Sequence, residues 1–228
     1  MSEPIGPKKR YFLLTAYFGL YLFVYQCLLA PYLYKKLGLS GFIVGDGIFN
    51  AFLMILFVLL NYDWLKKQWD IYQKAGWKGI WISIRTVLWL YASNLLFSLF
   101  VYIPLNLSSA ENQINNDMVM KRDPVGFAFS ALIVAPFVEE MVFRGCIFHP
   151  LAKKKGFTAG ALCSGLLFGG IHVLASIETG NWLNLWYLLL YGMCGFVLCD
   201  PYAETDSIFA GIIAHSLFNL FSVVLSFL

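Results

Sequence analysis

The chain has 228 residues, of which 60% are hydrophobic and only 13% are charged, and its mean hydropathy is +0.70. An ordinary soluble domain carries charge on roughly a quarter of its residues. This composition therefore excludes a disordered chain, a nucleic-acid binder and a conventional soluble enzyme. The formal net charge of +3 comes from lysines that flank long apolar blocks, so it indicates no acidic partner.

The apolar blocks predict an all-α transmembrane bundle that forms a single membrane domain over residues 1–228. About 20 apolar residues suffice to cross the ~30 Å hydrocarbon layer of a membrane as a helix. Blocks of this kind predict about seven spans, at residues 11–34, 37–62, 79–105, 124–148, 156–177, 179–199 and 207–228. Residues 63–78 mix tryptophan with lysine, which is typical of a helix lying in the headgroup layer. Residues 106–123 are expected to form a polar loop.

The distribution of Lys and Arg predicts the orientation. Ten of these residues flank the side that holds the N-terminus, and four flank the other side. Since cytoplasmic loops carry the excess of positive charge, we expect a cytoplasmic N-terminus in a multi-pass protein. The small size and the Lys-rich loops favour a bacterial plasma membrane.

Several polar residues of the apolar blocks are expected to be structural. Asp46 follows a Gly-x-x-x-Gly pattern, which favours a kink or a helix interface. Arg85 is interpreted as a membrane anchor, and His149 is placed at the cytoplasmic boundary. The five cysteines include no C-x-x-C pair, so we expect buried free thiols and not disulfides or a zinc site.

A first cluster of charged residues lies in the fourth apolar block. Placing an ionisable side chain inside a membrane span costs free energy, so such residues are rare there. The sequence of the cluster is Glu139-Glu140-x-x-x-Arg144. On a helix, Glu140 and Arg144 are separated by one turn and can form an ion pair. Glu139 is turned about 100° from Glu140, so it can face a cavity while its neighbour is paired.

Two further clusters lie in the fifth and seventh blocks, as Phe168-x-x-x-His172 and His215-x-x-x-Asn219. Gly165, Gly169 and Gly170 leave one face of the fifth helix nearly bare, which permits close approach of a neighbouring helix. His215 and Asn219 point the same way and form a patch that could hold an oxyanion or supply half of a metal site.

Each of these residues also has a purely structural interpretation. An intramembrane histidine can be a hydrogen-bonded packing residue, an asparagine can join two helices, and a Glu–Arg pair can neutralise itself. Two of the three histidines and both adjacent glutamates nevertheless fall on three otherwise apolar spans. The sequence therefore predicts that the fourth, fifth and seventh spans meet around one functional cavity.

The order of these three motifs resembles the CPBP family, which comprises CAAX-protease-like intramembrane proteases and bacteriocin-processing and immunity proteins, also called the Abi family. The resemblance covers residues 125–228, taken as the motif-bearing catalytic core of the chain. It implies an intramembrane endopeptidase similar to the CAAX prenyl endopeptidase. By the same resemblance Glu139 activates a water with help from His172, His215 and Asn219 stabilise the oxyanion, and Glu140 and Arg144 support the site.

The expected partners are membrane lipid and a membrane-associated peptide or protein substrate. No cofactor is expected. Zinc at Glu139, His172 and His215 is an alternative that we disfavour, because Asn219 would be idle beside a zinc ion. A non-catalytic immunity or signalling protein of the same fold is the alternative function. A proton-coupled transporter is disfavoured because no internal repeat is visible.

Overall fold

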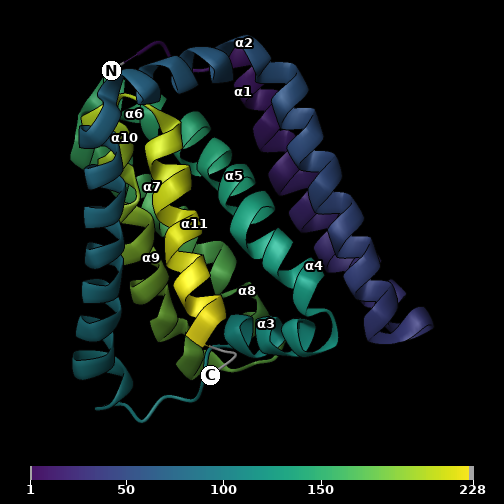
Figure 1. The fold of residues 1–228 in the computed structure, drawn as a ribbon. Coiled ribbons are helices and arrows are strands. Elements are labelled where there is room, and N and C mark those ends of the chain that lie inside the picture. Colours follow the sequence, from purple (N-terminus) through teal and green to yellow (C-terminus); the bar gives the residue numbers. More distant parts are fainter. Residues whose placement is uncertain (1, 226–228) are drawn as a thin grey trace.

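The computed structural model describes residues 2–225, except for the side chains of Glu178 and Leu225. Every regular element in this range is a helix (Figure 1). The prediction of an all-α bundle is confirmed.

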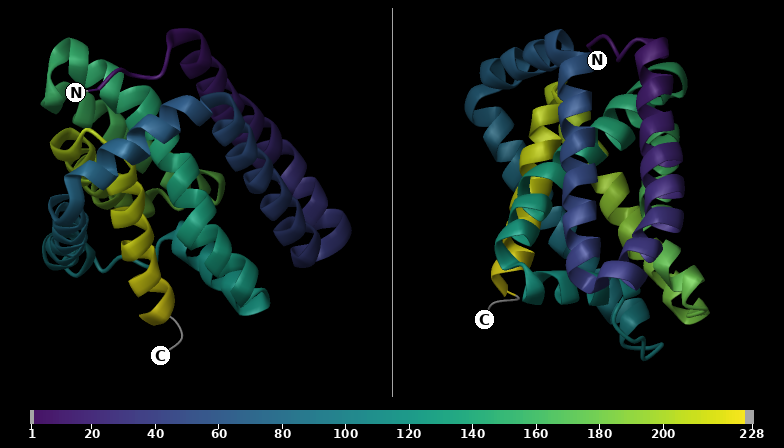
Figure 2. Two further views of the ribbon diagram at one scale, coloured as in Figure 1. Left: turned by 45° about the horizontal axis from the view of Figure 1, so that its top comes forward. Right: turned by 90° about the vertical axis from the view of Figure 1, so that its right-hand side faces the viewer.

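Three straight segments that run along the length of the molecule, at residues 7–38, 38–61 and 76–102, form its first three legs (Figure 1). The N-terminal part that contains them runs almost without interruption through four helical elements. They are α1 (Pro7–Leu14), the π-helical η1 (Thr15–Leu29), the long α2 (Ala30–Phe97) and the π-helical η2 (Ser98–Tyr102). The path of α2 breaks at Gly38 (φ 69°), Asn61 and Gly76 (φ 53°). The two positive φ values lie in the left-handed region, which glycine adopts without a steric penalty. The chain therefore descends, returns, crosses one end of the molecule and descends again (Figures 1 and 2).

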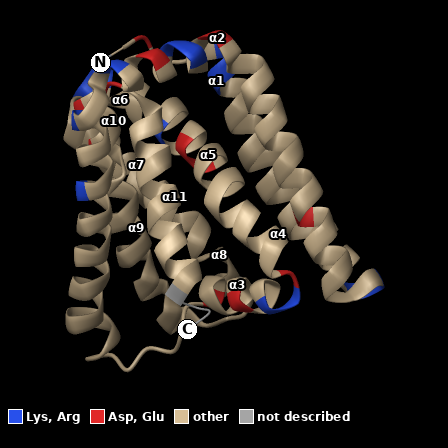
Figure 3. Cartoon of the chain, viewed as in Figure 1, with Lys and Arg blue, Asp and Glu red and all other residues tan. Residues whose placement is uncertain are grey.

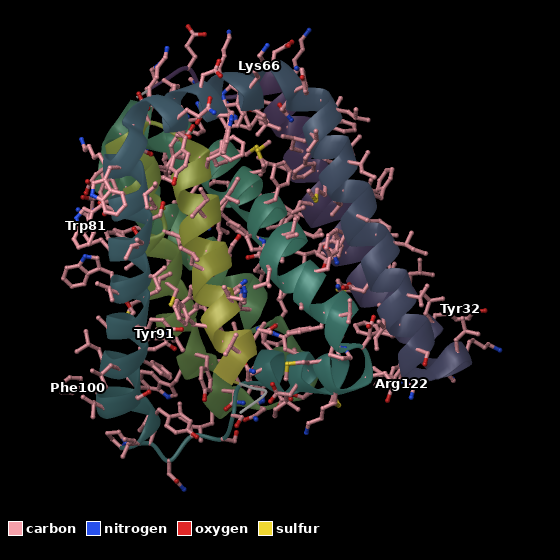
Figure 4. The ribbon with its side chains drawn as sticks, in the orientation of Figure 1. Tyr32, Lys66, Trp81, Tyr91, Phe100 and Arg122 are labelled. Atoms are coloured by element: carbon pink, nitrogen blue, oxygen red, sulfur yellow. The ribbon has the colours of Figure 1, made fainter. Side chains whose placement is uncertain are left out.

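The segment between Asn61 and Gly76 matches the helix expected in the headgroup layer. It lies across one end of the bundle, close to the N-terminus, and Lys66 projects away from the helices there (Figure 4). Lys and Arg residues also gather at this end of the molecule (Figure 3). This arrangement suits a helix that rests at the surface of a membrane.

The polar loop expected at residues 106–123 is wrong for most of its length. Residues Glu111–Arg122 form the helix α3, at the opposite end of the molecule from the N-terminus (Figure 1). Glu111 occupies its first turn and Lys121 and Arg122 its last turn, which complements the helix dipole. A hydrogen bond from Gln113 Nε2 to Asp117 Oδ1 (2.7 Å) adds support one turn apart. The helix was missed because it has almost no apolar periodicity.

The fourth leg is a continuous rod that carries the first motif. It comprises α4 (Pro124–Phe129), the π-helical η3 (Ser130–Val134), α5 (Ala135–Glu139), the π-helical η4 (Glu140–Phe148) and α6 (His149–Lys155). Asp123 caps its start, because its carboxylate accepts a hydrogen bond from the Gly126 amide at 3.0 Å. Pro124 follows at the first helical position, where no amide hydrogen is needed.

The remaining elements complete the bundle. They are α7 (Phe157–His172), α8 (Leu174–Glu178), the 3₁₀-helical η5 (Trp182–Trp186), α9 (Tyr187–Val197), α10 (Cys199–Thr205) and α11 (Ile208–Leu225). The bare face expected on the fifth span packs against α9. A Cβ atom at Gly165 or Gly169 would lie within 3 Å of the α9 backbone, whereas one at Gly170 would meet nothing within 4 Å. Two of the three glycines therefore allow α7 and α9 to pack closely.

Apolar side chains cover the outside of the molecule. Leu59, Trp77 and Phe100 are each more than 70% exposed, and the side chains of Trp81 and Phe100 project outward from the third leg (Figure 4). Three helices within the described range are long and apolar enough to cross a membrane, and two shorter apolar helices accompany them. An outer surface of this kind suits lipid, so the chain is a membrane protein. All five cysteines are free, as expected, but the expectation that they are buried holds only for Cys146, Cys194 and Cys199, since Cys27 is exposed and Cys163 is half-buried.

Candidate active site

The three motifs converge on one cavity of about 340 Å³. Glu139 reaches it from the fourth leg, His172 from α7, and His215 and Asn219 from α11. The convergence expected from the sequence is therefore present in the structure. Helices α9 and α3 and the N-terminal hairpin formed by residues 7–61 also contribute to its walls.

Glu140 and Arg144 form a buried ion pair behind the cavity wall. Arg144 Nη1 lies 3.0 Å from Glu140 Oε1, and both side chains have no exposed surface. The guanidinium also donates a hydrogen bond from Nη2 to the Gly195 carbonyl (2.8 Å), and it lies over the Phe168 ring at 4.9 Å. The pair thus joins η4 to α9 and α7, which agrees with the structural role predicted for it.

His215 lies between the two adjacent glutamates. Its Nδ1 is 3.1 Å from Glu140 Oε1, and its Nε2 is 3.9 Å from Glu139 Oε2. Because Glu140 also faces Arg144, its carboxylate acts as the acceptor, and His215 Nδ1 carries the proton between them. The Glu139 side chain is 17% exposed and lines the cavity, so of the two carboxylates it is the one that a ligand in the cavity can reach.

His172 is oriented by its own helix and by α9. Its Nδ1 lies 2.8 Å from the Phe168 carbonyl, which only accepts hydrogen bonds, so Nδ1 carries a proton. The ring is stacked on Tyr191 with 4.8 Å between centroids. In the neutral imidazole Nε2 therefore presents a lone pair, and it is the nitrogen left for a ligand.

Asn219 has a structural contact as well as a place in the cavity wall. Its Nδ2 donates one hydrogen bond to the Ala131 carbonyl at 2.8 Å, which ties α11 to η3. The amide carries a second hydrogen on the same nitrogen, which remains for another acceptor. The structural and the functional interpretations of Asn219 are thus compatible.

Of two polar residues expected to be structural, one departs from its expected role and the other keeps it. Arg85 does not act as an isolated anchor: its Nη2 forms ion pairs with Asp200 (2.6 Å) and Glu204. Asp46 lies at a helix interface and not at a kink, since α2 breaks at Gly38 and Asp46 bonds across to Gln26. Asp46 also lines the cavity, which the local pattern could not show.

The cavity contains no ready-made metal site among residues 2–225. No three His, Cys, Asp or Glu side chains of this range are grouped as metal ligands. Both ring nitrogens of His215 face carboxylate oxygens, and His172 Nδ1 is held by a carbonyl. The donor set would have to rearrange before Glu139, His172 and His215 could bind one ion together.

Comparison with known proteins finds a family similar to the motif-bearing part of the chain. Residues 121–221 match the family described as "Type II CAAX prenyl endopeptidase Rce1-like". No solved structure matches the chain.

Three curated bacterial proteins are similar to parts of the chain. "Putative membrane peptidase YdiL" of Bacillus subtilis is 37% identical over 93 residues, which are 41% of this chain and 34% of that protein. "UPF0177 protein YvdC" of Lactococcus lactis is 26% identical over 178 residues, or 77% of this chain and 64% of that protein. "UPF0177 protein YxdF" of the same organism is 27% identical over 173 residues, or 74% of this chain and 88% of that protein. The chain thus spans about a third and just under two thirds of the first two relatives. Residues 121–221 are thus similar to the Rce1-like family, and the family resemblance predicted from the three motifs is confirmed.

Proposed function

We propose that the protein is an intramembrane endopeptidase that hydrolyses a peptide bond in a membrane-associated peptide or protein. The observation that carries the proposal is the pairing of Glu140 with Arg144, which leaves the adjacent Glu139 as the carboxylate in the cavity. Peptide hydrolysis in an apolar layer needs a base, a place to hold water and donors for the developing oxyanion. Glu139, His172, His215 and Asn219 line one cavity and supply these groups.

In the proposed reaction, a water molecule is held between Glu139 and His172. The lone pair of His172 Nε2 accepts one hydrogen bond from the water, while the Glu139 carboxylate removes the other proton. The bond between the water oxygen and the peptide carbonyl carbon forms at the same time. When the carbon–nitrogen bond breaks, the proton held on Glu139 passes to the departing amine.

The carbonyl oxygen becomes an oxyanion that must accept hydrogen bonds. Asn219 supplies the amide hydrogen not used by the Ala131 carbonyl. His215 can donate through Nε2 only when that nitrogen is protonated as well as Nδ1, so the proposal assigns it the imidazolium form. Its position between Glu139 and Glu140 favours this role, since both neighbours are carboxylates.

The proposal includes no metal ion and no cofactor, and it places the N-terminus on the cytoplasmic side of a bacterial plasma membrane. The expected partners are membrane lipid and the peptide substrate. Elemental analysis of purified protein is expected to find no stoichiometric zinc. One tightly bound zinc per chain, lost together with activity in His172→Ala, would contradict this assignment.

The test of the function compares the wild-type protein with Glu139→Gln in intact cells. Membrane and secreted peptides of the two strains are compared by mass spectrometry, and thermal unfolding of both purified proteins is measured in detergent. We expect the wild-type strain to contain cleavage products that are absent from the Glu139→Gln strain. The two purified proteins should unfold at the same temperature. Identical peptide profiles would contradict an endopeptidase and favour a protein of the same fold that acts by binding.

A further inference from the structure

The wall of the cavity carries more negative than positive charge. Three carboxylates line it, from Asp46, Asp117 and Glu139, against one cation, the imidazolium proposed for His215, and no Lys or Arg is found among the described residues of its wall. Arg144 lies behind the wall and is already paired with Glu140. A ligand that enters this space therefore meets negative charge and hydrogen-bonding groups on an apolar background, which favours a ligand with a positive charge.

Asp46 is the carboxylate of this set that lies farthest from the three motifs in sequence. Its Oδ1 accepts a hydrogen bond from Gln26 Nε2 and its Oδ2 accepts one from Asn50 Nδ2, each at 2.9 Å. The Tyr21 hydroxyl accepts from the same two amides, at 3.0 and 3.3 Å. These partners are neutral, so they hold the carboxylate in place without balancing its charge.

Packing of the N-terminal hairpin does not account for a carboxylate at this position. The two helices already approach so closely that a Cβ atom at Gly45 would lie 2.7 Å from Leu33 Cδ1. The Tyr25 and Phe49 rings stack across the hairpin with 4.8 Å between centroids. An asparagine at position 46 could still bond to both helices once one partner amide turned its carbonyl oxygen toward the new NH2 group, so these hydrogen bonds do not by themselves require a negative charge.

Asp46 and the candidate catalytic carboxylate of Glu139 line the same cavity. Tyr21 lines this cavity with them, and its hydroxyl shares the Gln26 and Asn50 amides with Asp46. Tyr17, one helical turn away, also lines the cavity. A peptide held at Glu139 can thus extend along the hairpin toward Asp46.

We propose that Asp46 is a specificity-determining residue that receives a cationic group of the peptide that Glu139 attacks. The group is an ammonium or guanidinium, carried by a lysine or arginine side chain or by the amino terminus of the peptide. The proposal rests on the endopeptidase function, and it names the substrate class as basic, membrane-associated peptides. Asp46 takes no part in the hydrolysis itself.

The experiment measures binding in the full chain carrying Glu139→Gln, so that cleavage does not interfere. Three fluorescent apolar nonapeptides serve as probes: an N-acetylated peptide with one central lysine, the same peptide with norleucine, and the norleucine peptide with a free amino terminus. We expect at least one cationic peptide to bind about tenfold tighter than the acetylated norleucine peptide, the scale of one modest charge pair. The tighter of the two cationic peptides identifies the recognised group.

Variants at position 46 decide the assignment. Adding Asp46→Asn should abolish the preference for the cationic peptide, whereas Asp46→Glu should retain most of it. Asp70→Asn is the matched control, because it removes the same charge from an exposed position outside the cavity. Thermal unfolding of each variant shows whether it is folded. Equal binding of all three peptides to the parent, or an undiminished preference in folded Asp46→Asn, would overturn the proposal.

Cleavage of the same peptides by the chain with Glu139 intact separates this inference from the function on which it rests. Selective binding through Asp46 without cleavage of any peptide would contradict the endopeptidase function and leave the cation subsite standing. Cleavage without selectivity dependent on Asp46 would contradict the subsite alone.

Discussion

Replacing Arg144 with methionine tests whether the buried ion pair stabilises the junction of η4, α7 and α9. The change removes a guanidinium that contacts Glu140 at 3.0 Å and the Gly195 carbonyl at 2.8 Å. Methionine keeps much of the volume, so the main effect is an unbalanced carboxylate in a place with no exposed surface. Removal of one partner from a buried pair typically costs about 3–5 kcal/mol.

The expected effect on thermal unfolding follows from the size of the chain. For 150–250 residues, 1 kcal/mol shifts the unfolding temperature by about 2–4 °C, so Arg144→Met should lower it by roughly 6–20 °C. Intrinsic tryptophan fluorescence of the purified protein in detergent measures this temperature. Arg85→Met is the matched control, because Arg85 is also paired but its side chain is 31% exposed. Such a pair contributes about 0–1 kcal/mol.

A double variant distinguishes the effect of an unbalanced buried charge from the effect of a lost packing contact. In Glu140→Gln/Arg144→Met no charge is left unbalanced, so its unfolding temperature should lie above that of Arg144→Met alone. If Arg144→Met lowered the temperature no more than Arg85→Met, the buried pair would contribute little and the reasoning would be refuted. A double variant less stable than the single one would refute it as well.

Two further predictions concern glycines and are measured by the same unfolding assay. Gly169→Ala should destabilise the protein by about 1–3 kcal/mol, since its Cβ would lie within 3 Å of the α9 backbone, whereas Gly170→Ala should not; equal effects would contradict the close helix contact. Gly211→Ala would place a Cβ 2.9 Å from Glu140 Oε2 and should destabilise by a similar amount, about 1–3 kcal/mol, whereas Gly47→Ala, with nothing within 4 Å, should be neutral. A neutral Gly211→Ala would show that the Glu140 carboxylate can move aside.

The sequence predicted the motif-bearing helices well, because their information is local. The spacing of Glu140 and Arg144 by one turn is enough to predict an ion pair, and the structure has it at 3.0 Å. The glycines of the fifth span predicted a close neighbour, and α9 is that neighbour. Periodicity and spacing within one helix carry such predictions, since they depend on helix geometry alone.

Contacts between distant segments could not be predicted in the same way. Arg85 pairs with Asp200 across 115 positions, and Asn219 bonds to Ala131 across 88 positions. The local sequence around each residue does not predict its partner, because the partner is determined by how distant helices pack against one another. Helix α3 was missed for a different reason: its polar residues give no apolar stripe, although several of them line the cavity.

The contact between Arg144 and the Gly195 carbonyl constrains how this protein can diverge. Gly195 lies outside the three motifs, yet a Cβ atom there would come within 2.9 Å of the Gly165 Cα atom and would separate the helices that bring its carbonyl to Arg144. A mutation of either residue alone leaves a buried polar group without its partner. Position 195 is therefore confined to glycine by the Gly165 backbone whichever residue stands at 144, and a change at 144 is best tolerated together with one at 140, since no buried carboxylate is then left unbalanced. A residue outside the three motifs is thus as constrained as the motif residue that it contacts.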